Sequence, residues 1–335
     1  MHKSPRHLLE LDDLTDVELR RVVELSRQEP NSNLMKQKSA ALLFEKPSAR
    51  TRHSTELAVK QLGGFPITVR GEEVSIGGRE SIGDVALTFS CYHSIIGARV
   101  FNHNVLVEMC KAIDAAGANT SVMNLLSDLA HPFQAVADLI TIVDELNCDF
   151  DSLKDLRITY VGDPNNVFNS LAICLSHFKT PINIASPPGF SPDKKVVQKV
   201  NKLGGRVFEI SDPVEAVKGA DVIYTDTWVS MGQEQDAQIK SERFKDYQVN
   251  GKLLKNVKST AIVLHCLPAH RGEEITDEVI DGSSSRVWKQ ARNREKAAMG
   301  IISFLIESGA VEAVVLDGKK KFAVDFTFFR SLPFT

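Results

Sequence analysis

The sequence has no surplus of positive charge and no long apolar run. Its 40 Lys and Arg residues are balanced by 43 Asp and Glu, which gives a formal net charge of -3 at pH 7. Nucleic acids and anionic membranes require clustered basic residues, so we expect neither as a partner. No span of about 18 or more apolar residues occurs, and residues 1–14 lack the apolar run of a signal peptide. We therefore expect a soluble, cytoplasmic protein.

Cysteine is scarce, and internal repeats and low-complexity tracts are absent. With 335 residues the chain is long enough for one large or two ordinary domains, and about three quarters of its unfolded surface can be buried. The five cysteines are odd in number and widely spaced. That pattern predicts reduced thiols rather than a disulfide framework, as in a cytosolic protein. The cysteines are Cys91, Cys110, Cys148, Cys174 and Cys266.

Short apolar or β-branched runs alternate with longer amphipathic stretches along the chain. This alternation is typical of repeated βαβ units and a mostly parallel sheet. We therefore predict an α/β fold with two doubly wound parallel-sheet domains. The expected strands are 40–44, 65–69, 95–100, 120–124, 157–161, 182–185, 207–210, 222–225 and 261–264. The expected helices of the first half are 17–27, 54–62, 81–92 and 105–115.

Two long helical segments frame the predicted domains. Residues 131–146 have an apolar periodicity that predicts a helix connecting the two series, and residues 293–306 predict a later helix. We therefore expect a first domain at 1–145 and a second at 150–290. Residues 311–335 contain a Gly-Lys-Lys-Lys turn between two apolar runs, which fits either a β-hairpin or an irregular extension, and they stay unassigned.

The segment from Phe44 to Arg52 predicts an anion site. It follows an apolar run and precedes a helical pattern, so its hydroxyls, guanidinium groups and free backbone amides converge where a helix begins. Such amides, together with the helix dipole, favour a phosphate, and Arg50 can add forked hydrogen bonds. The alternative is that Ser48 only caps the helix, with the arginines pointing to solvent.

Arg99 and His131 are further candidates in the first half. Arg99 lies at the carboxyl end of an expected strand, where ligands gather in open α/β sheets. Its alternative is a surface ion pair. His131 and Gln134 begin the connecting helix, three residues apart on one face, and can donate hydrogen bonds to a carbonyl oxygen. A His-Pro pair is also a common start of a helix.

In the second half, Cys266 follows the expected strand 261–264. A buried cysteine is usually a small apolar side chain. Zinc binding by His265, Cys266 and His270 fits the residue types, but no second ligand pair stands at a recognised spacing, so we expect no metal.

Asp226 and a turn at Ser230–Gly232 follow the strand 222–225. The carboxylate can bind an α-ammonium group, and the amides of the turn can bind an α-carboxylate. Asn166 adds an amide after the strand 157–161, although a simple turn explains that composition equally well. Arg294 has charged neighbours, so on its own it fits a solvated helix face.

Six motifs together resemble the ornithine carbamoyltransferases in order and approximate spacing. The similarity runs from about Arg6 to about Phe304, nearly the whole chain. Several motifs in register are more specific than any one alone. The motifs are Ser48–Arg52, Arg99, His131–Gln134, Asp226–Gly232, His265–Pro268 and Asn293-Arg294.

The resemblance implies transfer of the carbamoyl group of carbamoyl phosphate to the side-chain amine of L-ornithine, in arginine biosynthesis or, in reverse, in arginine catabolism. It implies no cofactor, a first domain that binds carbamoyl phosphate and to which the later helix returns, and a second that binds ornithine. It assigns catalysis to Arg50, Arg99, His131 and Cys266. Carbamoyl phosphate falls to Ser48, Ala49, Arg50, Thr51, Arg99, His131, Gln134, Cys266, the Leu267 carbonyl and Arg294, and ornithine to Asn166, Asp226, Ser230 and Met231.

The resemblance also implies a homotrimer with active sites at subunit boundaries, to which the Gly71–Glu80 loop contributes. Ser75 stands where a longer polar side chain is usual, so we expect Arg70 or Arg79 to make that contact. Ala49 replaces a hydroxyl residue and Pro164 a glycine.

Other enzymes of this class fit less well. Aspartate carbamoyltransferases differ around His265–Pro268 and lack Ser230–Gly232, and the intact Asp226–Gly232 segment fits a free α-amino acid better than N-acetylornithine or putrescine. A nucleotide-binding oxidoreductase of similar architecture would carry G-x-G-x-x-G, which is missing. An inactive, ligand-binding paralogue is disfavoured because every charged catalytic position is present.

Overall fold

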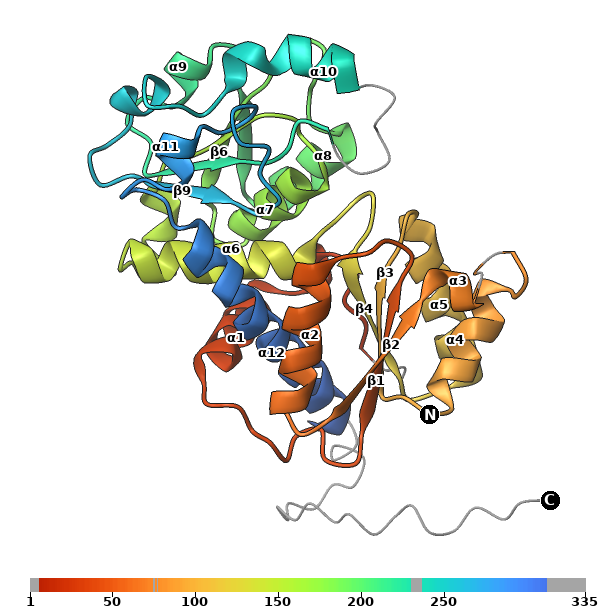
Figure 1. The fold of residues 1–335 in the computed structure, drawn as a ribbon. Coiled ribbons are helices and arrows are strands. Elements are labelled where there is room, and N and C mark those ends of the chain that lie inside the picture. Colours follow the sequence, from red (N-terminus) through yellow and green to blue (C-terminus); the bar gives the residue numbers. More distant parts are fainter. Residues whose placement is uncertain (1–5, 75, 77, 230–236, 312–335) are drawn as a thin grey trace, which may run out of the picture.

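The computed structural model describes residues 6–74, 76, 78–229 and 237–311. Within them the chain forms a four-stranded and a five-stranded sheet, and every strand pair within these sheets is parallel. Each sheet occupies its own lobe with helices around it (Figure 1). This confirms the predicted α/β fold with two parallel-sheet halves joined by long helices.

The first sheet has the strand order β2-β1-β3-β4. The central strands are almost completely buried because their apolar runs face helices on both sides. The strands are β1 (Ser39–Phe44), β2 (Phe65–Arg70), β3 (Ile95–Arg99) and β4 (Ser121–Leu126), and the helices that follow β1, β2 and β3 are α2 (Ala49–Gln61), α3 (Gly71–Val74), α4 (Ile82–Ser90) and α5 (His103–Ala116).

Two elements of this lobe differ from the prediction. Helix α2 begins at Ala49, five residues before the expected 54, because Ser48 caps it and its first turn is polar. The segment Gly71–Glu80, expected as a loop, opens with the single helical turn α3. The Glu73 carboxylate accepts a 3.0 Å hydrogen bond from the Arg70 amide and so stabilises that turn.

The second sheet has the order β7-β6-β5-β8-β9. Its strand order reverses between β5 and β8, which places a crevice at their carboxyl ends. The strands are β5 (Ile158–Val161), β6 (Pro181–Ala185), β7 (Arg206–Glu209), β8 (Val222–Thr225) and β9 (Ile262–His265). The helices are α7 (Asn166–Ser176), α8 (Lys194–Lys202), α9 (Pro213–Ala216), α10 (Ala237–Phe244) and α11 (Asp277–Ile280), with 3₁₀ helices at Leu11–Asp13, Leu153–Asp155, Lys245–Tyr247 and Leu253–Asn256.

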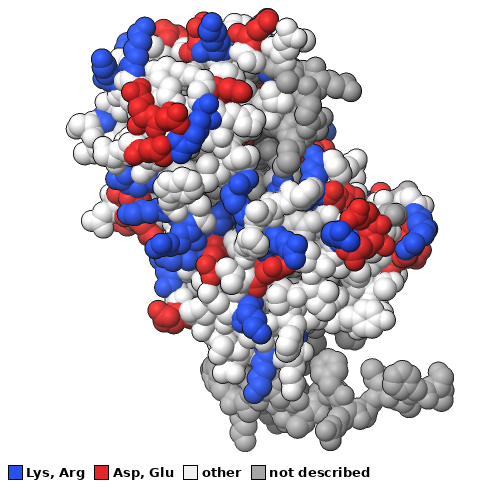
Figure 2. Space-filling view, viewed as in Figure 1, with Lys and Arg blue, Asp and Glu red and all other residues white. Residues whose placement is uncertain are grey.

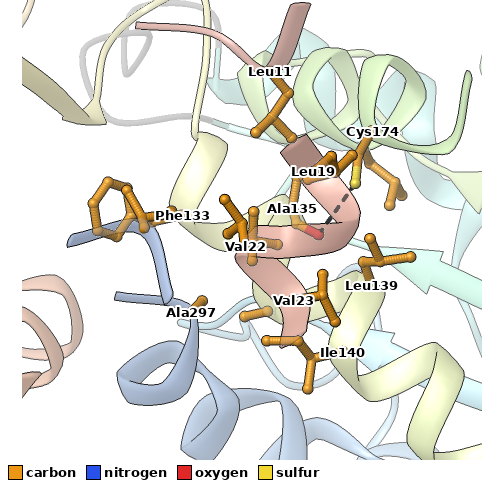
Figure 3. Packing of buried hydrophobic residues seen from close by; sticks show 14 of the residues in the cluster. Leu11, Leu19, Val22, Val23, Phe133, Ala135, Leu139, Ile140, Cys174 and Ala297 are labelled. Carbon is orange, nitrogen blue, oxygen red and sulfur yellow. Dashed lines mark hydrogen bonds between the residues drawn. The ribbon is translucent and has the colours of Figure 1, made fainter. Parts of the chain in front are cut away.

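Helices α6 (Pro132–Glu145) and α12 (Val287–Val311) join the lobes (Figure 1). Helix α6 is buried from Pro132 to Val143, because α1 (Asp16–Arg27), α7 and α12 surround it, as the close packing of Leu19, Val22, Leu139 and Ala297 illustrates (Figure 3). Helix α12 returns to the first lobe and packs against α1 and α2, as predicted, although it begins six residues before 293.

The surface carries charges of both signs. Lys and Arg side chains alternate with Asp and Glu over the face shown in Figure 2, which agrees with their scatter in the sequence. None of the described helices is both long and apolar enough to cross a membrane. Residues 312–335, for which a hairpin or an extension was expected, lie outside the described part of the chain.

Candidate active site

A cavity of about 1330 Å³ opens at the carboxyl ends of strands from both sheets. Ala49 is not among its lining residues, and Ser230 and Met231 lie outside the described residues, as does Ser75. The cavity brings together side chains, such as those of Ser48 and Arg294, that are more than two hundred residues apart in the sequence. The predicted site residues that line the cavity are Ser48, Arg50, Thr51, Arg99, His131, Gln134, Asn166, Asp226, Cys266, Leu267 and Arg294.

Three arginines gather at the first turn of α2. The Ser48 side chain caps this helix, accepting a 3.3 Å hydrogen bond from the Thr51 amide. The Thr51 hydroxyl oxygen accepts bonds from Arg294 Nη2 at 2.9 Å and Arg99 Nη1 at 3.4 Å. Arg99 and Arg294 are each only 4% exposed, which excludes the alternatives of a surface ion pair for Arg99 and a solvated helix face for Arg294.

Arg99 and Arg294 contact hydroxyl and amide oxygens rather than carboxylates in the part of the chain that the structure describes. Among the described residues, neither Arg99 nor Arg294 has a carboxylate within ion-pair distance, and the Nε atom of each is buried without a hydrogen-bond partner. Burial lowers the pKa of Arg99 to about 10, with Arg294 and Arg50 lowering it further. Burial is also the main cause that lowers the pKa of Arg294 to about 10. Both remain cationic at neutral pH, so this end of the cavity suits a compact anion.

His131 lies beside this cluster at the start of α6. Its amide donates a 2.7 Å bond to the Ser170 hydroxyl, and its buried Nδ1 has no hydrogen-bond partner. The pKa of His131 lies well below its ordinary value, first because of burial and then because of the nearby arginines. The imidazole is therefore neutral at pH 7 and can donate one hydrogen bond without adding charge.

The cavity is also lined by a carboxylate, that of Asp226. Asp226 follows β8, and its Oδ1 accepts a bond from Cys266 Sγ at 3.0 Å, while its Oδ2 accepts one from Asn165 Nδ2 at 2.8 Å. Burial, together with Asp226, raises the pKa of Cys266 well above its ordinary value, so the thiol stays protonated. Asn165 was not predicted, although it also caps α7 by accepting from the Val167 amide at 2.9 Å.

Asn166 bridges the two lobes. Its Nδ2 donates a 2.7 Å bond to the Ser127 carbonyl, in the loop that leads to His131. Asn169 likewise donates to the Leu129 carbonyl at 3.0 Å. The side-chain NH2 of Asn166 is thus partly used to hold the loop that carries His131.

The residues of the zinc alternative do not converge on a metal. His265 Nε2 lies 2.9 Å from Glu274 Oε1, and its Nδ1 accepts a 2.9 Å bond from the Leu267 amide. Both ring nitrogens are therefore engaged. Asp226, His265 and Cys266 do bring their ligand atoms within 4.8 Å of one another, but two of them already share the thiol hydrogen bond.

Comparisons with known proteins agree with this geometry. Residues 6–144 match the model of the aspartate/ornithine carbamoyltransferase carbamoyl-P binding domain, and residues 154–305 match that of its Asp/Orn binding domain. The ornithine carbamoyltransferase of Hyperthermus butylicus is 42% identical over 314 residues, covering 90% of this chain and 97% of the relative. That of Methanocaldococcus jannaschii is 41% identical over 311 residues, covering 90% and 99%.

A solved structure is similar as well. That of the ornithine carbamoyltransferase from Pyrococcus furiosus superposes with a TM-score of 0.83 at 39% identity, over 91% of this chain and 98% of that one. Fold and site together define a two-lobed α/β protein with a basic cluster between its lobes. The chain belongs to the aspartate/ornithine carbamoyltransferase family.

Proposed function

We propose that this protein transfers the carbamoyl group of carbamoyl phosphate to the side-chain amine of L-ornithine. The neutral amine nitrogen bonds to the carbamoyl carbon, the bond from that carbon to the phosphate oxygen breaks, and one amine proton passes to the departing phosphate, which gives citrulline and phosphate. The observation that carries the proposal is the arginine cluster, which lines one cavity together with the Asp226–Cys266 pair.

The phosphate binds at the first turn of α2. Ser48, Thr51 and the Ala49 amide supply hydrogen bonds there, and Arg50 and Arg99 supply charge. As the bond to the carbamoyl carbon breaks, negative charge grows on the leaving phosphate, and preorganised cations stabilise it without reorganisation. Arg294 holds Thr51 in place from α12.

The carbamoyl group lies between His131 and Cys266. The neutral imidazole donates to the carbonyl oxygen as it becomes an oxyanion. The protonated Cys266 thiol and Leu267 also line the cavity, and the Leu267 carbonyl can accept from the carbamoyl –NH2.

Ornithine binds at the carboxyl ends of β5 and β8. Asp226 supplies a carboxylate for the α-ammonium group, and Asn166 supplies an amide. Ser230 and Met231 are assigned to the α-carboxylate. The free cysteines of the described chain support a reducing, cytoplasmic location.

The choice of acceptor tests this function directly. Citrulline formation from ornithine is expected to exceed carbamoylation of aspartate, putrescine and N-acetylornithine by about a hundredfold, because each of these lacks one group that the site would bind. N-acetylornithine has no α-ammonium group for Asp226, putrescine has no α-carboxylate, and the single amine of aspartate cannot both react and pair with Asp226. Initial rates with equal concentrations of the four acceptors measure this. A faster reaction with any other acceptor overturns the assignment.

We further propose a homotrimer with shared active sites. Three exposed apolar side chains on the neighbouring α2 and β2, Leu57, Phe65 and Ile67, support a subunit contact on this lobe. Arg70 already pairs with Glu73 at 3.0 Å, whereas Arg79 lies 3.7 Å from Glu80. Arg79 is therefore the better candidate to reach a neighbouring subunit's anion site.

Hybrid trimers test the sharing of sites. Arg50→Ala and Arg79→Ala subunits are expected to be weakly active alone and to recover activity when they are unfolded and refolded together. In such mixed trimers, some sites combine Arg50 of one subunit with Arg79 of its neighbour, and these sites lack neither side chain. Light scattering reports the trimer, and citrulline formation reports recovery. A monomer, or inactive mixtures of two inactive variants, contradicts the proposal.

A further inference from the structure

Asp138 is a completely buried carboxylate on α6, outside the cavity lining. Its Oδ1 accepts hydrogen bonds from Gln134 Nε2 and Gln290 Nε2, both at 2.7 Å, and its Oδ2 accepts one from the Tyr224 hydroxyl at 3.0 Å. Burying a carboxylate is costly unless hydrogen bonds replace its water. Three donors from three elements do so here.

The hydrogen bond from Gln134 fixes which way that amide points. Its NH2 faces Asp138, so its Oε1 faces Arg294, which donates to it from Nη1. A guanidinium has only donors, so it can pair with the oxygen of the Gln134 amide but not with its NH2 group. The contact with Arg294 therefore requires the same amide orientation as the contact with Asp138. The other nitrogen, Arg294 Nη2, donates to Thr51 in the first turn of α2. Asp138 is thereby linked to the anion site through two side chains.

Gln290 fixes Asp138 from the other side. Its Oε1 accepts a 2.9 Å bond from the His265 amide, directly before Cys266. Its Nε2 also lies 3.1 Å from the Tyr224 hydroxyl. The carboxylate is therefore held between α6, α12 and the strands β8 and β9 of the second lobe.

We propose that Asp138 is a positioning residue for carbamoyl transfer: it holds the Gln134 amide so that the amide oxygen orients Arg294 at the anion site. The inference rests on the proposed function, because Arg294, which Gln134 contacts, holds Thr51 at the proposed phosphate site. Asp138 itself touches no reacting atom.

The protonation of Asp138 affects this role. Burial raises its pKa to about 7, against the hydrogen bonds from Gln134, Gln290 and Tyr224, which lower it. The ionised form accepts all three hydrogen bonds, whereas the protonated form must donate one and so competes with a donor. The positioning should therefore weaken as the pH falls through about 7.

The other titratable groups around Asp138 keep their charge in that range. Arg294 is cationic, with a pKa near about 10. Burial raises the pKa of each remaining neighbour, so these stay neutral while Asp138 titrates. They are Tyr160 of β5, Cys174 of α7, Tyr224 of β8 and Cys266 after β9.

Two substitutions separate the hydrogen bond from the charge. Asp138→Leu keeps the branching of the side chain, with methyl groups that are larger than the oxygens, and removes the acceptor, so kcat should fall at least about tenfold and the KM for carbamoyl phosphate should rise. Asp138→Asn keeps an amide oxygen for both glutamine donors, so it should retain at least about a third of the activity and lose the decline below about pH 7. The matched control is Asp144→Asn, at an exposed position of the same helix, where Asp144 pairs with Arg27.

A double substitution tests the route. If Asp138 acts through Gln134, Asp138→Leu with Gln134→Ala should be within about twofold of Gln134→Ala alone. Calorimetric titration with inorganic phosphate gives a readout that needs no acceptor, and Asp138→Leu should bind it several-fold more weakly. Additive losses, or unchanged kinetics in Asp138→Leu, overturn the inference.

Two outcomes distinguish a failure of the Asp138 inference from a failure of the proposed function. If Asp138→Leu does not fold, an Asp138→Asn enzyme that keeps the wild-type decline below about pH 7 also overturns the inference. A wild-type enzyme without activity toward ornithine overturns the proposed function instead.

Discussion

Replacing Arg50 with alanine is expected to lower kcat for citrulline formation by about a hundredfold or more, equivalent to about 2.7 kcal/mol. Arg50 lies in the first turn of α2 and lines the cavity together with Arg99 and Arg294. Its guanidinium is assigned to the phosphate, which gains negative charge as it leaves. Because this end of the cavity is largely buried, the charge is less screened there than in water.

Arg52 provides a matched control for this substitution. It lies two residues further along the same helix, is exposed, and pairs with Glu56 at 2.8 Å. Arg52→Ala should therefore stay within about twofold of the wild-type rate, since an exposed ion pair contributes little. Thermal stabilisation by phosphate should be reduced in Arg50→Ala and retained in Arg52→Ala. Turnover of Arg50→Ala within about threefold of the wild type would show that the phosphate role is wrong.

The sequence predicted the strands well because buried parallel strands are short apolar runs. β1 and β8 begin and end within one residue of the expected bounds, and their residues are almost all buried. The start of α2 was missed because its first turn, from Ala49, faces the cavity and carries no apolar stripe. The first residues of α12 were missed for a different reason, because the buried Gln290 interrupts the apolar pattern.

The candidate site was predictable where a motif combines several functional residue types. The hydroxyls and arginines after β1, and the cysteine after β9, stand at strand ends, so the parallel topology places each group at the carboxyl edge of its own sheet. The arrangement of the two lobes then brings both edges to one cavity. Asp138 and Asn165 were not predictable in this way. Each has a hydrogen-bond partner more than 60 residues away, Gln290 for Asp138 and Asp226 for Asn165, and no local pattern reveals such contacts.

Replacing Asp226 with asparagine is expected to lower kcat/KM for ornithine by about a hundredfold, because the α-ammonium group then loses its charged partner. The substitution keeps the shape of the side chain and one oxygen that can accept from Cys266 or Asn165. Phosphate binding should be largely retained, because the hydrogen bonds of Asp226 go to Cys266 and Asn165 and not to the arginine cluster. Steady-state kinetics with ornithine and calorimetry with phosphate separate the two effects, and ornithine kinetics close to wild type would contradict the role of Asp226.

The same substitution should change the reactivity of Cys266. After burial, the negative charge of Asp226 is the next cause that raises the pKa of this thiol. Asp226→Asn removes that charge, so the pKa should fall toward its ordinary value and more thiolate should be present at a given pH. Alkylation of Cys266 by iodoacetamide at about pH 8, followed by peptide mass spectrometry, should therefore be faster in the variant. The exposed Cys91 is the internal control and should react equally in both proteins. Equal alkylation rates at Cys266 in the two proteins would show that the Asp226 carboxylate does not raise the pKa of the thiol. They would also show that the hydrogen bond between the two side chains does not keep Cys266 protonated.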